Sequence, residues 1–280
     1  AEVSNIVDIL KSPRHTSLGS GDVWVQTVEH LMASLSGLGI DNLLIEINSN
    51  EIPAMDGSSL PFAEVIKNAG ILEQEAQKKS FVIREPLWVE DDLAYVVVFP
   101  SNDFRLSYTL NYDNTFIGSQ YLNLAVTPDT FEKDLAPART FCLQKEVDGL
   151  LSLGLGKGAS YDNTLVVSDS GVVKNKLRFA DEFVRHKILD LMGDISLLGF
   201  AVKGHVIAVR SGHNLNIKLI QKIKSKREKW MEGALRPAEE IKVAGTELDI
   251  NVIKRILPHR YPFLLVDKII MMDNMRIVGV

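Results

Sequence analysis

One predicted helix carries a histidine and two aspartates on a single face, and this polar stripe constrains the chain more than any other feature. His186, Asp190 and Asp194 follow one another at steps of four, and residues four apart lie on the same side of a helix. The apolar Leu189, Ile195 and Leu198 around them place the stripe beside buried surface. A buried carboxylate needs a partner, and imidazole with carboxylate is an ordinary ligand set for a divalent metal such as Zn²⁺.

The same spacing also suits a surface hydrogen bond or a local ion pair, so the stripe alone leaves a structural role open. Two other segments favour the metal. His30 is the candidate third ligand, and Glu29 directly before it resembles the zinc-protease arrangement, in which a glutamate beside a ligand histidine acts as general base. His213 stands where a strand is expected to lead into a helix, and Asp194 is a candidate to hydrogen-bond and orient it.

Composition excludes several classes of protein. Of the 280 residues, 46% are hydrophobic and 24% charged, which argues for a globular chain of one or two domains. No apolar run is long enough to span a membrane, and the first residues lack the pattern of a secretion signal. The single Cys142 excludes an internal disulfide and suits a reducing cytosol, and the net charge of −5 gives no reason to expect nucleic acid. We expect a cytoplasmic protein that is not integral to a membrane.

Hydrophobic periodicity predicts an α+β fold with strands and helices in each half of the chain. Residues 1–79 are expected to form a first unit and residues 80–230 a second. In the first unit we predict strands at 23–27 and 42–48, a helix at 28–38 and a short helix that begins at Pro61. In the second we predict strands at 81–84, 94–99, 104–110, 121–126 and 202–209, and helices at 143–153, 181–198 and 213–230.

The composition changes after Trp230. Residues 231–246 have the polar, Gly- and Pro-punctuated character of a linker. Residues 247–280 are predicted to begin a new domain, with a helix at 250–257 and a buried strand at 263–270. This last segment is too short to form a core of its own, so we expect the chain to stop inside its last domain.

Four motifs in order resemble one known family. They are the segments 28–42, 51–58, 181–190 and 211–216. Together they resemble UDP-3-O-acyl-N-acetylglucosamine deacetylase, the zinc enzyme of lipid A biosynthesis, over about residues 1–230. The resemblance implies two similar layered α+β domains with their helices packed between two sheets. That family begins with a Gly-rich Leu-His stretch that has no counterpart here, so we expect the first domain to be incomplete.

The resemblance also implies the parts of a site and its reaction. It assigns zinc to His30, His186 and Asp190, with the fourth position left to water. Glu29 would take a proton from that water, and His213, held by Asp194, would stabilise the oxyanion and protonate the departing amine. The substrate would be a UDP-linked acylated N-acetylglucosamine, and the products acetate and a free amino sugar.

Several further residues have weaker assignments. Thr140 resembles the family's threonine that hydrogen-bonds the tetrahedral intermediate. Lys187 is a candidate contact to the sugar or diphosphate, although solvation explains a lysine there equally well. Phe141 is a candidate for the passage of the acyl chain, and core packing is its alternative. Cys142 stands where a glycine is expected, and we assign it no role. His205, inside an apolar strand, is expected to be a structural histidine.

The segment 249–267 resembles a second family, the 3-hydroxyacyl-[acyl-carrier-protein] dehydratases, which have a hot-dog fold. The chain therefore looks like a piece of a bifunctional protein, shortened at both ends, that also uses acyl carrier protein and assembles through the hot-dog domain. That family's catalytic histidine, in a His-Phe-Pro-Gly segment, and its catalytic acid have no counterpart in this chain. We expect no dehydratase activity from residues 1–280.

Two other functions stay open from the sequence. In one, the chain binds metal or a sugar nucleotide without catalysis, as a remnant of an enzyme. Alternatively, it would be a zinc amidohydrolase that acts on a different N-acetylated amine, with the same chemistry and another substrate.

Overall fold

The computed structural model describes residues 14–232, apart from 21, 77, 79 and 157, together with 250, 253, 269–272 and 277–279. The chain divides into two compact units, residues 1–226 and 227–280. In the second unit, β12 (Ile269–Met272) and β13 (Ile277–Gly279) form an antiparallel pair. The predicted linker and most of the predicted helix 250–257 and strand 263–270 lie outside the described residues.

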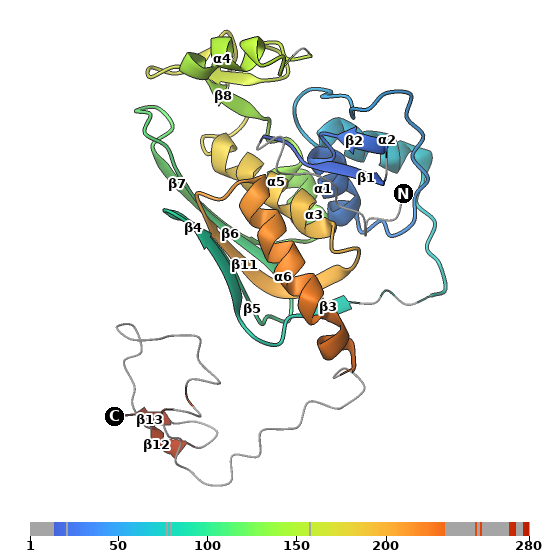
Figure 1. The fold of residues 1–280 in the computed structure, drawn as a ribbon, viewed down its shortest axis with the longest axis vertical. Coiled ribbons are helices and arrows are strands. Elements are labelled where there is room, and N and C mark those ends of the chain that lie inside the picture. The colour runs from blue at the N-terminus through green and yellow to red at the C-terminus, as the bar shows by residue number, and fades with distance from the viewer. Residues whose placement is uncertain are drawn as a thin grey trace. The chain divides into compact units, whose positions relative to one another are not determined.

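A six-stranded mixed sheet is the largest layer of the first unit (Figure 1). Its strands run in the order β4-β5-β11-β6-β7, and β3 pairs with the start of β11. β11 is antiparallel to β5 and parallel to β6. The strands are β3 (Ser80–Val82), β4 (Leu87–Asp91), β5 (Ala94–Phe99), β6 (Phe104–Asn111), β7 (Ser119–Ala125) and β11 (Ala201–Val209).

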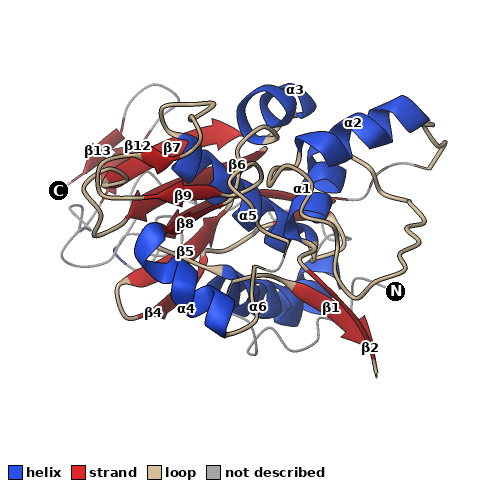
Figure 2. Cartoon of the chain, turned by 90° about the horizontal axis from the view of Figure 1, so that it is seen from above, coloured by secondary structure: helices blue, strands red, loops and turns tan. Residues whose placement is uncertain are grey.

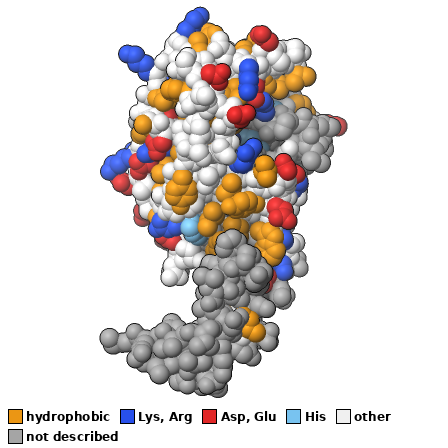
Figure 3. Space-filling view, turned by 90° about the vertical axis from the view of Figure 1, so that its left-hand side faces the viewer, with side chains coloured by type: hydrophobic (Ala, Val, Ile, Leu, Met, Phe, Trp, Pro, Cys, Tyr) orange, Lys and Arg blue, Asp and Glu red, His pale blue; other side chains and the backbone are white. Residues whose placement is uncertain are grey.

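The two faces of this sheet differ because side chains alternate along each strand. In β11, Val202, Val206 and Ala208 are buried, whereas His205 and Ile207 between them are only partly buried. The buried set faces the helices. Hydrophobic side chains also gather on the outward face, as Figure 3 shows. The sheet thus has one face in the core and one face at the surface.

Helices α5 (Glu182–Ser196) and α6 (His213–Glu232) lie on the inward side of the sheet (Figure 1). α5 packs on β6 and β7, and α1 (Glu29–Leu38) packs on α5 from the other side. Because α5 is enclosed in this way, 12 of its 15 residues are buried. Polar residues on α5 therefore lie in the interior, where each needs a partner.

Smaller elements complete the first unit (Figure 2). β1 (Ser17–Ser20) and β2 (Val23–Gln26) form a hairpin ahead of α1, and α2 (Leu60–Ala69) follows with a proline in its first turn. A second sheet has the order β10-β9-β8 and carries a short helix between its strands. Its elements are β8 (Phe141–Leu143), α4 (Val147–Ser152), β9 (Leu165–Val167) and β10 (Val172–Val173). The remaining helical segments are α3 (Pro128–Thr130), a π-helical turn (Phe131–Leu135) and a 3₁₀ turn (Gln144–Glu146).

The α+β class predicted from the sequence is confirmed, and most of the predicted long elements are present. The predicted strand 42–48 is wrong, because residues 42–47 form no strand. Leu43, Leu44 and Ile47 are exposed, and among the described residues only the isolated bridge between Gln26 and Glu51 forms near this segment. A segment with alternating apolar residues forms a strand only when a neighbouring strand provides hydrogen-bond partners for its backbone. The division between residues 1–79 and 80–230 stays a prediction.

Candidate metal centre and active site

The polar stripe predicted on one helix lies along the buried side of α5. His186, Asp190 and Asp194 all belong to this helix and are all buried. His30 and Glu29, in the first turn of α1, are buried as well. Because α1 packs on α5, the two segments bring their polar groups to one place.

Three of these side chains form a cluster that can hold a cation. One ligand atom from each of His30, His186 and Asp190 lies within 4.8 Å of the others. The Asp190 Oδ1 atom is 3.6 Å from His30 Nε2 and 3.3 Å from His186 Nε2. The two imidazole rings meet edge to face, with centroids 4.9 Å apart. Two imidazole nitrogens and one carboxylate oxygen fit the donor preference of Zn²⁺.

The backbone fixes which nitrogen of His186 can bind a metal. His186 Nδ1 lies 3.0 Å from the carbonyl oxygen of Ala138. Since a carbonyl only accepts, Nδ1 must carry the proton, and the lone pair is left on Nε2. Burial lowers the pKa of His186 to about 4, against the opposing charge of Asp190. The ring is therefore neutral near pH 7, as a ligand histidine must be.

Asp190 is kept ionised by its neighbours. Burial alone would raise its pKa, but the neighbouring His186, Lys187 and His30 side chains hold the pKa well below its ordinary value. The strongest charge that persists at neutral pH is Lys187, whose Nζ donates to Asp190 Oδ2 at 2.9 Å. Burial would lower the pKa of Lys187, and the charge of Asp190 outweighs this and raises it. Lys187 is thus paired with a candidate ligand.

Glu29 and His213 face each other next to this cluster. The Glu29 Oε1 atom is 4.0 Å from His213 Nε2, and both side chains are buried. Burial raises the pKa of Glu29, while the charge of His213 opposes the rise. A carboxylate with a raised pKa accepts a proton more readily than an exposed one.

His213 is the first residue of α6 and has an aspartate partner on α5. Its Nδ1 lies 2.9 Å from Asp194 Oδ2, and Asn216 donates to the same oxygen at 2.8 Å. Burial would lower the pKa of His213, but the charge and hydrogen bond of Asp194, together with Glu29, raise it to about 9. His213 is therefore a cation near pH 7, with its Nε2–H toward Glu29.

Phe141 contacts the His186 ring, and Thr140 directly precedes Phe141 in the chain. The Thr140 backbone N–H donates to the carbonyl of Gly57 at 2.8 Å, and the Phe141 ring lies edge to face with that of His186, with centroids 6.4 Å apart. The Phe141 ring also contacts Tyr112, which lines a cavity of about 400 Å³. None of the cavity's lining residues belongs to the cluster, so the cavity is separate from the candidate centre.

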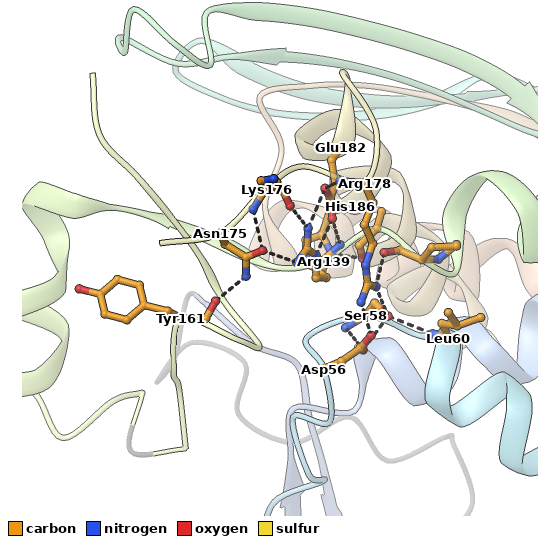
Figure 4. A network of polar contacts seen from close by, with 12 residues as sticks. Asp56, Ser58, Leu60, Arg139, Tyr161, Asn175, Lys176, Arg178, Glu182 and His186 are labelled. Atoms are coloured by element: carbon orange, nitrogen blue, oxygen red, sulfur yellow. Dashed lines mark hydrogen bonds and ion pairs between the residues drawn. The ribbon is translucent and has the colours of Figure 1, made fainter. Parts of the chain in front are cut away.

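A buried ion pair anchors the first turn of α5 one turn before His186 (Figure 4). The Glu182 carboxylate is fully buried and accepts from the backbone N–H and the guanidinium of Arg139. It also accepts from the backbone N–H of Arg178, whose guanidinium reaches Asp56 at 2.8 Å. Glu182 thereby connects α5 to the backbone of Arg139. The carbonyl of the preceding residue, Ala138, accepts from His186 Nδ1 and orients its ring.

Sequence reasoning missed Thr16, Ala138, Arg139, Glu182 and Asn216, which support the site by contacts between distant segments. No local spacing signals such contacts. Cys142 is partly exposed in β8. His205 lies on the outward face of β11, where its Nε2 is 2.7 Å from Ser107 Oγ. It is therefore remote from the cluster, as expected of a structural histidine.

The fold and the cluster together define an α+β protein with a buried His-His-Asp site for a cation. Comparisons with known proteins agree with this class. A model of the family described as "UDP-3-O-acyl N-acetylglycosamine deacetylase" matches residues 1–225. The chain therefore belongs to this deacetylase family.

Individual relatives support the same conclusion. The UDP-3-O-acyl-N-acetylglucosamine deacetylase of Nostoc sp. (strain PCC 7120) is 45% identical over 213 residues, which are 74% of this chain and 76% of that protein. The deacetylase of Syntrophus aciditrophicus is 39% identical over 216 residues, 77% of this chain and 69% of the relative. The bifunctional enzyme LpxC/FabZ of Chlorobaculum tepidum is 38% identical over 299 aligned positions, 96% of this chain.

This chain spans 63% of the length of the bifunctional relative. Among the residues that the structure describes, no helix is both long enough and apolar enough to cross a membrane.

Proposed function

We propose that this chain hydrolyses the N-acetyl group of a UDP-linked 3-O-acyl-N-acetylglucosamine and releases acetate and the free amine. The observation that carries the proposal is the convergence of His30, His186 and Asp190 beside Glu29 and His213. Membership of the deacetylase family supports the substrate class. Such a reaction is the committed step of lipid A biosynthesis, and we infer that it takes place in the cytoplasm.

We infer that His30, His186 and Asp190 hold Zn²⁺. The donor set fits because both Nε2 atoms point to the same carboxylate, His186 is neutral and Asp190 is ionised. When bound, Zn²⁺ supplies a Lewis acid that polarises the acetamide carbonyl and makes water a better nucleophile. Lys187 compensates the charge of Asp190 at Oδ2, while the histidines lie near Oδ1, and it is also a candidate contact to the sugar nucleotide.

The chain's own residues then move the protons. Glu29 takes one proton from the attacking water as the C–O bond forms, since its raised pKa suits a general base. His213, protonated at Nε2, donates a proton to the amide nitrogen as the C–N bond breaks, because an amine leaves poorly as an anion. Asp194 holds the imidazolium in place.

Thr140 and Phe141 are proposed to contact the substrate. Thr140 lies beside Phe141 at the edge of the small sheet, and we assign its hydroxyl to the oxyanion that forms at the carbonyl carbon. Phe141, in contact with the ring of His186, would border the acyl chain.

The test measures zinc content and acetate release in the same purified protein. UDP-3-O-acyl-N-acetylglucosamine is compared with free N-acetylglucosamine, both at saturating zinc. One zinc per chain with release from the nucleotide substrate alone supports the proposal. Zinc without any release would favour a binding role, and equal release from both substrates would indicate an amidohydrolase of broader specificity.

The similarity to a bifunctional relative supports a second, smaller proposal. We infer that residues 247–280 belong to a dehydratase part that acts on a 3-hydroxyacyl group of acyl carrier protein and forms oligomers in the longer protein. Assay of residues 1–280 with a 3-hydroxyacyl carrier-protein thioester is expected to give no enoyl product. Formation of that product would contradict the inference.

A further inference from the structure

Thr16 connects the two proton-transfer residues proposed above, although neither the sequence pattern nor the family comparison assigns it a role. The residue lies just before β1 and is fully buried. Its backbone N–H donates to Glu29 Oε2 at 3.0 Å, and its hydroxyl donates to Asp194 Oδ1 at 2.6 Å. One residue therefore contacts both the proposed base and the partner of the proposed acid.

The direction of each hydrogen bond follows from what the groups can do. Asp194 is an acceptor only, so the Thr16 hydroxyl must be the donor to it. The hydroxyl oxygen also lies 3.1 Å from His213 Nδ1, whose N–H already points to Asp194 Oδ2. Asp194 thus has two donors besides His213, namely Thr16 on one oxygen and Asn216 on the other.

We propose that Thr16 is a positioning residue for the deacetylation reaction, which holds the Glu29 carboxylate through its N–H and the Asp194 carboxylate through its hydroxyl. The inference rests on the proposed function, since it concerns the base and acid of that reaction. Each carboxylate has its second oxygen turned toward His213: Glu29 Oε1 faces Nε2, and Asp194 Oδ2 accepts from Nδ1. Thr16 fixes the opposite oxygen in both cases.

The hydroxyl of Thr16 also matters when His213 gives up its proton. Asp194 then becomes a buried carboxylate without a cationic partner, and its remaining donors are the Thr16 hydroxyl, Asn216 and the Nδ1–H of the neutral His213 ring. Without the Thr16 hydroxyl this state is less stable, so His213 holds its proton more tightly. The other titratable groups that face His213 are Glu29 from α1, Asp190 from α5 and His15 from the segment before β1. They are the same in the variants used below.

The experiment separates the hydroxyl from the rest of the side chain. Thr16→Val keeps the shape and the backbone N–H but removes the hydroxyl, and Thr16→Ser keeps the hydroxyl. Thr109→Val is the matched control, because Thr109 lies in β6 and its hydroxyl makes no hydrogen bond with another described residue. Imidazole resonances are titrated by NMR in metal-free protein, and His213→Gln identifies the His213 signal among the six histidines.

We expect Thr16→Val to raise the pKa of His213 by about half a unit to one unit. In the zinc-loaded protein kcat should fall about tenfold and the basic limb of its pH profile should move upward, with KM and zinc content unchanged. Thr16→Ser and Thr109→Val should behave like the wild-type protein. If Thr16→Val does not fold, Thr16→Ala removes the same hydroxyl without added bulk.

Two results would overturn the proposal. One is a Thr16→Val protein with wild-type His213 titration and pH profile. The other is a Thr16→Ser protein as impaired as Thr16→Val, because packing of the methyl group would then explain the loss. A wild-type protein without deacetylase activity would defeat the proposed function instead. In that case a raised pKa of His213 in Thr16→Val would still support the role of Thr16 in positioning Asp194 against His213. An unchanged pKa of His213 would contradict that role.

Discussion

Gly193 of α5 lies directly against the backbone of Glu29 in α1. A Cβ atom at position 193 would be 2.1 Å from the Glu29 carbonyl oxygen, closer than any real contact. The two helices therefore cross at a point where only glycine fits. This crossing lies between Asp190 and Asp194 along the chain, and it brings Glu29 and His30 to the polar stripe of α5.

Gly193→Ala is expected to push α1 away from α5. We expect the free energy of unfolding to fall by about 1–3 kcal/mol, because a side chain is forced into a packed contact. Zinc affinity should fall as well, since His30 moves with α1. Gly149→Ala is the control, because Gly149 is also helical and a Cβ there meets nothing within 4 Å. Chemical denaturation and zinc titration measure both effects, and equal behaviour of the two variants would contradict the prediction.

Removal of a proposed ligand should release the metal. For His30→Ala, His186→Ala and Asp190→Ala we expect zinc affinity at least about 100-fold weaker than in the wild-type protein. His205→Ala, on the outward face of the sheet, should keep full zinc content. Metal analysis after dialysis against a chelator gives the answer, and full occupancy in His186→Ala would show that the ligand assignment is wrong.

Glu29→Gln and His213→Gln should retain zinc but lose turnover, because both residues are assigned to proton transfer and not to ligation. We expect kcat to fall by about 10²–10⁴-fold in each. Glu29→Gln should remove the acidic limb of the pH profile and His213→Gln the basic limb. An unchanged pair of limbs in both variants would refute the assignment.

The His213–Asp194 pair should contribute to stability in a pH-dependent way. The pKa of His213 is raised in the folded protein to about 9 from 6.5, so its contribution is fully present below pH 6.5 and is lost as the pH rises through 9. At its full value we expect about 3 kcal/mol. The measurement compares the unfolding free energies of metal-free wild-type protein and His213→Gln between pH 6 and 10. A difference that does not shrink over this range would count against the pairing.

Glu182→Gln should destabilise the fold strongly, because it leaves the buried Arg139 guanidinium without its counter-charge. We expect a loss of about 3–5 kcal/mol in the free energy of unfolding. Glu132→Gln breaks the more exposed pair with Lys67 and should cost less than about 1 kcal/mol. Denaturation curves of the two variants measure the loss in the free energy of unfolding. Similar losses in both would contradict the prediction that the buried Glu182 pair stabilises the fold more than the exposed pair.

The α5 stripe could be predicted from the sequence because it depends on helical spacing, which is a local property. His30 and His213 could be found only by residue type and family motif, since their partners lie on other helices. The contact of His186 with Ala138, the role of Glu182 and the position of Thr16 depend on how distant segments pack. From the sequence, Gly193 indicates only a cost in helix propensity. The close contact between Gly193 and the backbone of Glu29 is evident only in the structure, where α1 packs on α5.

The two proposed ligand histidines, His30 and His186, are separated by more than half of the 280 residues. During synthesis His30 leaves the ribosome long before His186. The segment of α1 is therefore present before α5, which carries the other two members of the cluster. The loop that must close between them is long, so its closure comes late and slows folding. We therefore expect the proposed zinc site to form only after α5 has been synthesised and has packed on α1.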